Sequence, residues 1–216
     1  MEDDVRALLA EYEARAKQEF QKMASLPAEE IGARIDEFLI CVGPETGQLL
    51  HILARSLKAR RIVEIGASYG YSTIWLAHAA KQTGGKVESF ELSASKVEFA
   101  RAKLRSVGLD AYVEFHVGDA LTNLAQLEGP LDLVLIDCWK NLYEPCFELV
   151  YPRLAAEGFI VADNMLYPED TRPHARAYQQ HVRSKPDLDS VLLPVGSGIE
   201  LTRHTPGTPI KSSVSR

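Results

Sequence analysis

Two aspartates and an asparagine follow apolar runs in the second half of the chain. Asp137 follows residues 131–136, and Asp163 and Asn164 follow residues 158–162. If these runs are neighbouring parallel strands, their carboxyl ends meet at one edge of a sheet. Two carboxylates and an amide oxygen suit Mg²⁺ or Mn²⁺. The alternative is helix capping or bonding to loop amides, which is the commoner role for a single aspartate. The set of three favours a metal.

Lys140 lies three residues after Asp137, in the loop that opens the next predicted helix. A nearby cation and the apolar Trp139 would both disfavour its ammonium form, which predicts a lowered pKa. A neutral lysine there is able to remove a proton from a substrate hydroxyl. The alternative is a solvated surface lysine.

A strand, a glycine-containing turn and a helix follow one another in RIVEIGASYGYSTIWLA, residues 61–77. Glycines at 66 and 70 let a ligand approach bare backbone at a helix N-terminus. Glu64 is a charged residue within the apolar strand and therefore needs a polar partner. Glu91 ends the next strand, where an acidic side chain suits the diol of a ribose.

The spacing of this turn distinguishes between nucleoside ligands. GASYG does not match the GxGxxG pattern of dinucleotide sites, so S-adenosyl-L-methionine (SAM) is the better fit. The alternative is that Gly66 and Gly70 serve ordinary turn geometry.

Composition narrows the class of protein. The chain has 216 residues, 46% of them hydrophobic, and a net charge of −6, which argues against a nonspecific nucleic-acid binder. The N-terminus has no apolar signal core and no run approaches membrane-spanning length, so we expect a soluble cytoplasmic protein. The cysteines, without a CxxC pair, are expected to be reduced thiols.

Apolar periodicity predicts helices in the first 58 residues and then an alternation of strands and helices. This pattern is typical of an α/β fold with a mostly parallel sheet covered on both faces. The last two strands are separated by only four residues, which predicts an antiparallel edge hairpin. The predicted strands are residues 61–65, 86–91, 112–116, 131–136, 158–162, 190–194 and 199–203. The predicted helices are residues 5–23, one after Pro27, and 46–58, 71–81, 95–107, 120–127, 142–154 and 172–184.

Three segments in this order resemble the cation-dependent O-methyltransferases, a family that includes catechol and caffeoyl-CoA O-methyltransferases and small bacterial relatives. They are residues 61–72, residues 131–143 with IDCWKNLY, and residues 158–164 with ADN. Residues 42–48 resemble the loop and helix start that precede the cofactor turn in that family. The resemblance implies a Rossmann-like class I methyltransferase fold with a seven-stranded, mostly parallel sheet.

The resemblance also implies a role for each matching residue. It assigns the cofactor to Glu64, Gly66 and Ser72 at the methionine end with Val42 and Tyr71 nearby, to Glu91 at the ribose, and to Ala120 and Trp139 at the adenine. The resemblance also counts Asp137 among the cofactor-binding residues. It assigns Mg²⁺, or Mn²⁺ or Ca²⁺, to Asp137, Asp163 and Asn164, and the role of base to Lys140.

Two positions depart from the catechol enzyme: Cys138 stands in place of a histidine beside the adenine, and Val191 falls where an acidic residue clamps the catechol. The expected acceptor is a small phenolic or catechol-like molecule. Two alternatives stay open, a hydroxylated tRNA base as acceptor and a non-catalytic SAM-binding interaction protein. We further expect one domain over residues 1–204 with a helical cap at about 1–58, a flexible tail over 205–216, and a homodimer.

Overall fold

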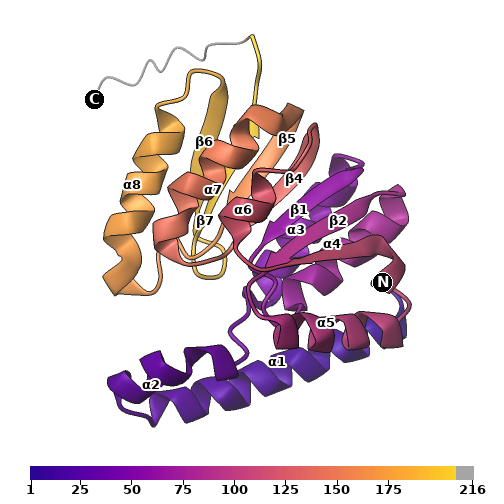
Figure 1. The fold of residues 1–216 in the computed structure, drawn as a ribbon, viewed down its shortest axis with the longest axis vertical. Coiled ribbons are helices and arrows are strands. Elements are labelled where there is room, and N and C mark those ends of the chain that lie inside the picture. The colour runs from indigo at the N-terminus through magenta and orange to yellow at the C-terminus, as the bar shows by residue number, and fades with distance from the viewer. Residues whose placement is uncertain (208–216) are drawn as a thin grey trace.

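A seven-stranded sheet forms the centre of the molecule (Figure 1). The computed structural model describes residues 1–207. The strands are β1 (Arg61–Ile65), β2 (Lys86–Glu91), β3 (Val113–Val117), β4 (Leu131–Ile136), β5 (Leu154–Ala162), β6 (Leu188–Leu193) and β7 (Ile199–His204). Their order in the sheet is β3-β2-β1-β4-β5-β7-β6. The first five are parallel, and β7 runs antiparallel to both β5 and β6.

The helices lie on both faces of the sheet. They are α1 (Asp3–Ala24), α2 (Ala28–Arg34), α3 (Gly43–Ser56), α4 (Tyr71–Thr83), α5 (Ala94–Ser106), α6 (Ala120–Leu124), α7 (Tyr143–Val150) and α8 (Arg172–Arg183). Short 3₁₀ turns are η1 (Ile35–Glu37), η2 (Asp110–Tyr112), η3 (Lys140–Leu142), η4 (Tyr151–Arg153) and η5 (Glu169–Thr171).

The alternation of side chains along the strands divides the core between the two faces. In β1, Val63 and Ile65 belong to the cluster that holds α6, α7 and α8, and Ile62 belongs to the cluster that holds α3 and α4. A third cluster joins α1, α4 and α5, with α1 running along α5 in Figure 1. The fold class predicted from sequence, including the antiparallel edge, is confirmed.

The order of strands creates the crevice in which ligands of open α/β sheets bind. The chain proceeds outward from β1 to β2 and β3, then returns to place β4 on the other side of β1. The carboxyl ends of β1 and β4 therefore meet at the point where the direction of winding reverses. The candidate site lies around this point.

Several element boundaries differ from the prediction, most of all the end of α7 and the start of β5. The helix expected over 142–154 ends at Val150, and η4 follows with Pro152 near its start. Proline lacks the amide hydrogen that a continuing helix needs, so the chain turns there. Strand β5 consequently starts at Leu154, earlier than predicted, and its pairing with β4 is irregular near Leu131.

Some sequence-based expectations stay predictions. The division into one domain with an N-terminal cap is not tested by these observations. The expected tail begins at Thr205, whose amide donates to the Asp187 carbonyl over 2.9 Å, and residues 208–216 lie outside the described part. Among residues 1–207, none of the helices combines the length and apolar character needed to cross a membrane.

A buried pair of histidines connects α3, α4 and the start of α1. His51 Nε2 lies 2.8 Å from His78 Nδ1, and His78 Nε2 lies 2.6 Å from the Glu2 carboxylate. Burial and the neighbouring His78 lower the pKa of His51 to about 4. His51 is therefore neutral in the native protein at neutral pH.

This lowered pKa predicts a pH-dependent stability. Between pH 6.5, the ordinary value for histidine, and about 4, the unfolded chain binds a proton at His51 that the native protein does not. The free energy of unfolding should therefore fall as the pH is lowered from 6.5 to about 4. In His51→Gln it should fall less steeply over the same range. Urea denaturation at several pH values will measure both slopes. Replacement of the exposed His174 by glutamine is the control and should keep the wild-type slope. Equal slopes for His51→Gln and the wild type would contradict the prediction.

Candidate active site

The turn between β1 and α4 lies directly against the end of β4. Gly66 has φ +98°, and a Cβ placed on it would lie 1.9 Å from the carbonyl oxygen of Asp137. The Asp137 amide in turn donates to the Ile65 carbonyl over 2.9 Å. Only glycine allows this approach, because it has no Cβ and adopts positive φ freely. The nucleoside turn and Asp137 therefore belong to one site.

Glu91 is held at the end of β2 with its carboxylate facing the turn. One oxygen accepts from the amide of Ser68 over 2.8 Å, and the other accepts from the amide of Ser93 over 2.9 Å. Ser68 has φ +48°, which brings its amide toward the carboxylate. Each oxygen keeps a second lone pair, so the carboxylate is oriented and still able to accept from two hydroxyls.

Glu64 lies beneath the turn in the interior of the protein. Its side chain is fully buried and accepts hydrogen bonds of 2.6 Å from the hydroxyls of Thr73 and Ser89. Its second oxygen, Oε1, has no partner among the described residues. Burial raises the pKa of this carboxyl, against the effect of hydroxyl donors that include Ser72. Glu64 therefore positions the first turn of α4.

Asp137 and Asp163 lie side by side at the carboxyl edge of the sheet. Their preceding residues, Ile136 and Ala162, are register partners in β4 and β5, and the Asp163 amide donates to the Ile136 carbonyl over 3.1 Å. Burial raises the pKa of both carboxyls, and the Asp137 charge raises that of Asp163 further. A positive charge near two carboxylates in one buried place would favour their ionised forms.

Asn164 completes this group of oxygen atoms. It has φ +56°, a left-handed conformation that asparagine adopts more readily than most residues. Its backbone amide donates to Asp163 Oδ1 over 2.7 Å. The other oxygen, Asp163 Oδ2, is buried and has no partner among the described residues. This oxygen is an acceptor beside Asn164 that could take a cation as its partner.

Lys140 extends from η3 to the same edge. Its ammonium donates to the Asp163 carbonyl over 3.1 Å and to Asn164 Oδ1 over 3.4 Å, and it contacts the Tyr143 hydroxyl. Burial lowers the pKa of Lys140 to about 8 despite the two nearby aspartates. The Tyr143 hydroxyl also donates to the Asp163 carbonyl over 3.1 Å. The buried Tyr143 therefore fixes the position of the Lys140 ammonium.

The donor set at this edge fits a hard divalent cation. Within residues 1–207, no three His, Cys, Asp or Glu side chains are grouped as a metal site, so the Asn164 amide would have to supply the third protein oxygen. Asp137, Asp163 and Asn164 offer only oxygen atoms, which is the preference of Mg²⁺ and Mn²⁺. The unpartnered Asp163 oxygen and the raised carboxyl pKa values both indicate that a further cation beside Lys140 would favour the charged form of these carboxylates.

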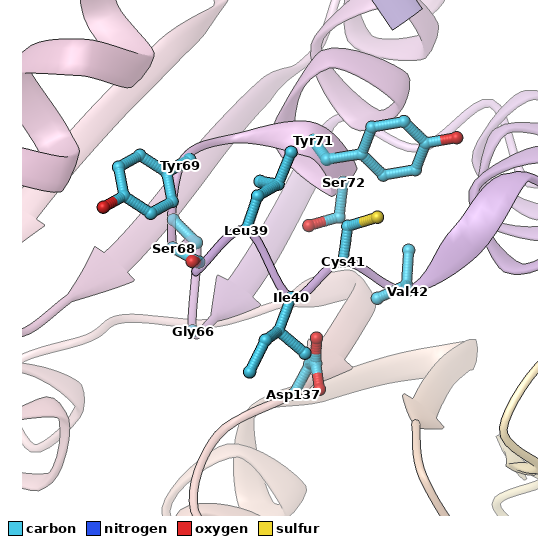
Figure 2. Close-up of a pocket in the computed structure, with 11 residues that line it drawn as sticks. Leu39, Ile40, Cys41, Val42, Gly66, Ser68, Tyr69, Tyr71, Ser72 and Asp137 are labelled. Atoms are coloured by element: carbon cyan, nitrogen blue, oxygen red, sulfur yellow. The ribbon is translucent and has the colours of Figure 1, made fainter. Parts of the chain in front are cut away.

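Two adjoining cavities open beside these residues. The larger has a volume of ≈ 420 Å³, within the range of about 300–1,000 Å³ usual for small-molecule sites. The site residues predicted from sequence that line it are Gly66, Glu91, Ala120, Asp137, Trp139, Lys140 and Asn164. Those that line the smaller cavity are Val42, Gly66, Tyr71, Ser72 and Asp137, shown in Figure 2. Glu64 and Asp163 line neither cavity and lie behind their walls.

The larger cavity is covered by the two regions that the sequence predicts for the pocket mouth, the N-terminal helical segment and the loop over residues 166–176, although sequence reasoning named no single residue in them. Ile35, Phe38 and Ile40 come from the segment between α2 and α3, and Pro168 and Thr171 come from the loop after β5. No local pattern marks them, because they reach the cavity only through the packing of distant segments. Asp119 also lines the larger cavity and caps α6 by accepting from the Thr122 amide. Its place after β3, at a strand end like that of Asp137, is a signal that sequence reasoning could have used.

The two positions that depart from the catechol enzyme have different surroundings. Cys138 lines the larger cavity, and its thiol interacts with that of Cys146; this contact and burial raise the pKa of Cys138. Val191 lies on the edge strand β6, is 49% exposed and lines neither cavity. The position of Val191 therefore carries no information about the acceptor.

Comparisons with known proteins agree with this geometry. Residues 63–165 match the methyltransferase domain family. The chain is 40% identical over 129 residues to a catechol O-methyltransferase from Mycobacterium tuberculosis, covering 59% of this chain and 58% of that protein. It is 35% identical over 132 residues to a catechol O-methyltransferase from Niastella koreensis, covering 59% of each. The matches thus span less than two thirds of these relatives.

A solved structure extends the likeness over nearly the whole chain. The O-methyltransferase TomG from Streptomyces achromogenes, in complex with SAM, superposes with a TM-score of 0.74 at 27% identity, covering 95% of this chain and 91% of that one. The chain is thus similar in sequence to catechol O-methyltransferases and in fold to a SAM-bound O-methyltransferase. The resemblance read from residues 61–72, 131–143 and 158–164 is therefore confirmed, and the methyltransferase domain match includes most of these residues.

The approach of Gly66 to Asp137 predicts a severe effect of a single methyl group. Gly66→Ala should unfold at lower temperature and lose binding of S-adenosylhomocysteine (SAH), because the new Cβ would overlap the Asp137 carbonyl. Gly108→Ala is the matched control, since Gly108 also has positive φ but has no atom within 4 Å of an added Cβ. It should cost only about 1–2 kcal/mol of stability and leave SAH binding unchanged. Thermal denaturation and titration calorimetry will measure both. Equal melting temperatures and equal SAH affinities of the two variants would contradict the conclusion that the close approach of Gly66 to Asp137 shapes the site.

Proposed function

We propose that this protein is a SAM-dependent, divalent-metal-dependent O-methyltransferase that methylates a hydroxyl of a small catechol-like acceptor. The observation that carries the proposal is the single edge at which Asp137, Asp163, Asn164 and Lys140 meet, next to the glycine turn. A cavity of ≈ 420 Å³ opens onto this edge. The catechol O-methyltransferase names of two relatives support the choice of acceptor.

The cofactor is proposed to lie across the turn and the ends of β1 and β2. Glu91, held by two backbone amides, would accept from the ribose hydroxyls. Ala120 and Trp139 would border the adenine at the far side of the larger cavity. The methionine end would lie against the smaller cavity, whose wall includes Val42, Tyr71 and Ser72, with Glu64 supporting Ser72 from beneath.

Asp137, Asp163 and Asn164 are proposed to hold the metal, with Mg²⁺ as the first candidate. A divalent cation, when bound, acts as a Lewis acid that lowers the pKa of an adjacent hydroxyl. Lys140 Nζ lies at the same edge and would receive the proton of the acceptor hydroxyl, and its contacts with Tyr143 and the Asp163 carbonyl hold it there. The protein's remaining contribution is the alignment of the acceptor oxygen with the cofactor methyl group.

The apolar mouth of the cavity supports a small aromatic acceptor. Ile40 and Trp139 are 48% and 59% exposed and both line the larger cavity, as do Phe38 and Leu142. An aromatic ring would cover part of this apolar surface. The homodimer and the cytoplasmic location expected from sequence stay predictions.

The metal requirement predicts a direct assay of methyl transfer. Labelled methyl from SAM should appear on a simple catechol acid with Mg²⁺ and should be absent with chelator. Asp163→Asn should abolish transfer while retaining SAH binding, because it keeps the shape of the side chain and removes the charge. Product that survives chelation would contradict the roles of Asp137, Asp163 and Asn164. Absence of product in both conditions would contradict the small vicinal-diol acceptor and favour another acceptor, RNA included.

Removal of the proposed base predicts a loss confined to turnover. Lys140→Ala should lower kcat by about 10²–10⁴-fold, the usual contribution of a positioned acid or base. Its affinity for SAH should stay within about twofold of the wild type, as calorimetry will show. Lys86→Ala, at the exposed start of β2, is the control and should keep full turnover. Full turnover in Lys140→Ala would show that another group takes the proton.

A further inference from the structure

Helix α1 contacts the outside of the cofactor turn through two adjacent residues. The Tyr12 hydroxyl donates to the Tyr69 carbonyl over 2.8 Å, and the Tyr71 hydroxyl donates to the Glu13 carboxylate over 2.8 Å. The ring of Tyr12 is 3% exposed and lies 6.1 Å, centroid to centroid, from that of Tyr71. The first bond therefore connects α1 to the backbone of the cofactor turn, and the second connects it to the side chain that begins α4.

The same helix also holds the segment Leu39–Val42, which we call the strap. Glu19 Oε2 accepts a hydrogen bond from the Leu39 amide, and Glu19 Oε1 pairs with Arg15 over 2.7 Å. The Arg15 guanidinium lies 4.6 Å from the centroid of the Tyr69 ring. A continuous series of contacts thus connects the strap, through α1, to the turn.

The strap and the turn are opposite walls of the smaller cavity. Figure 2 shows Leu39, Ile40, Cys41 and Val42 crossing beside the turn, with Asp137 next to them. Tyr12, Glu13 and Glu19 line neither cavity, so they would not touch a bound cofactor. Their effect on the cavity is exerted only through the two walls that they hold.

We propose that Tyr12, Glu13 and Glu19 are positioning residues that set the affinity for the cofactor, acting through Tyr69, Tyr71 and Leu39. The inference rests on the proposed function, in which this cavity binds the methionine end of SAM. A wall that is already held in its bound conformation does not have to be ordered when the ligand arrives, so affinity rises without any added contact. By linkage, a bound cofactor also stabilises the contacts of α1 with both walls.

The test compares contacts at the two ends of α1. Tyr12→Phe removes one hydroxyl and keeps the packed ring, and Glu13→Ala removes the acceptor of the Tyr71 hydroxyl. Each should raise the Kd for SAH by about 3-fold to 10-fold, the equivalent of one hydrogen bond. Glu13→Gln keeps an acceptor oxygen and should restore the wild-type Kd.

The matched control lies at the start of the same helix. Glu2→Ala removes contacts with His78 and Lys81, which attach α1 to α4 on the side away from the turn. It should lower the melting temperature but leave the Kd for SAH within twofold of the wild type. In turnover assays, Tyr12→Phe and Glu13→Ala should raise the KM for SAM, with kcat at saturating SAM changed less than twofold.

The outcomes separate this inference from the function on which it rests. SAH binding by the wild type decides whether the cavity is a cofactor site, and its absence would overturn both claims. Given binding, unchanged Kd values in Tyr12→Phe and Glu13→Ala would overturn the inference alone. An equal loss of affinity in Glu2→Ala would also overturn it, because the effect would then follow from general loosening of α1.

Discussion

The site depends on one close contact between backbones, that of Gly66 with the Asp137 carbonyl. It brings the first turn of the parallel sheet against the end of β4, where a Cβ would come within 1.9 Å of the oxygen. Because β4 is paired with β5 in register, the same contact places Asp163 and Asn164 beside the turn. The two halves of the site, one for a nucleoside and one rich in oxygen ligands, thereby adjoin.

Buried negative charge is the second physical feature of this arrangement. Glu64, Asp137 and Asp163 all lie near the carboxyl ends of central strands, and burial raises the pKa of each. Each of Glu64 and Asp163 has one oxygen without a partner among the described residues, but the other oxygen of Glu64 accepts from two hydroxyls whereas that of Asp163 accepts from a backbone amide. Lys140 is the cationic side chain in contact with the Asp163–Asn164 segment.

The N-terminal helix connects the site to the rest of the molecule. Its first half is buried against α4 and α5, with Val5, Leu8 and Leu9 in the shared core. Its next turns present polar groups to the turn and the strap, where they make hydrogen bonds beside the packed ring of Tyr12. Apolar packing thus docks the helix, and polar contacts determine the position of the cavity walls.

Sequence by itself determined the local elements and the polar residues at the strand ends. Apolar runs, glycines and chain order were enough to predict β1, β2 and β4 with their observed bounds, and the alternation of strands and helices predicted the sheet. Asp137, Asp163 and Asn164 could be paired in advance because parallel neighbours end at a common edge. Tertiary structure alone decided the rest. Ile35, Phe38, Ile40 and Pro168 reach the cavity through the packing of segments far apart in the chain, and no local periodicity encodes such contacts. The same holds for Tyr12 and Glu13, whose partners lie 57 and 58 residues further along the chain.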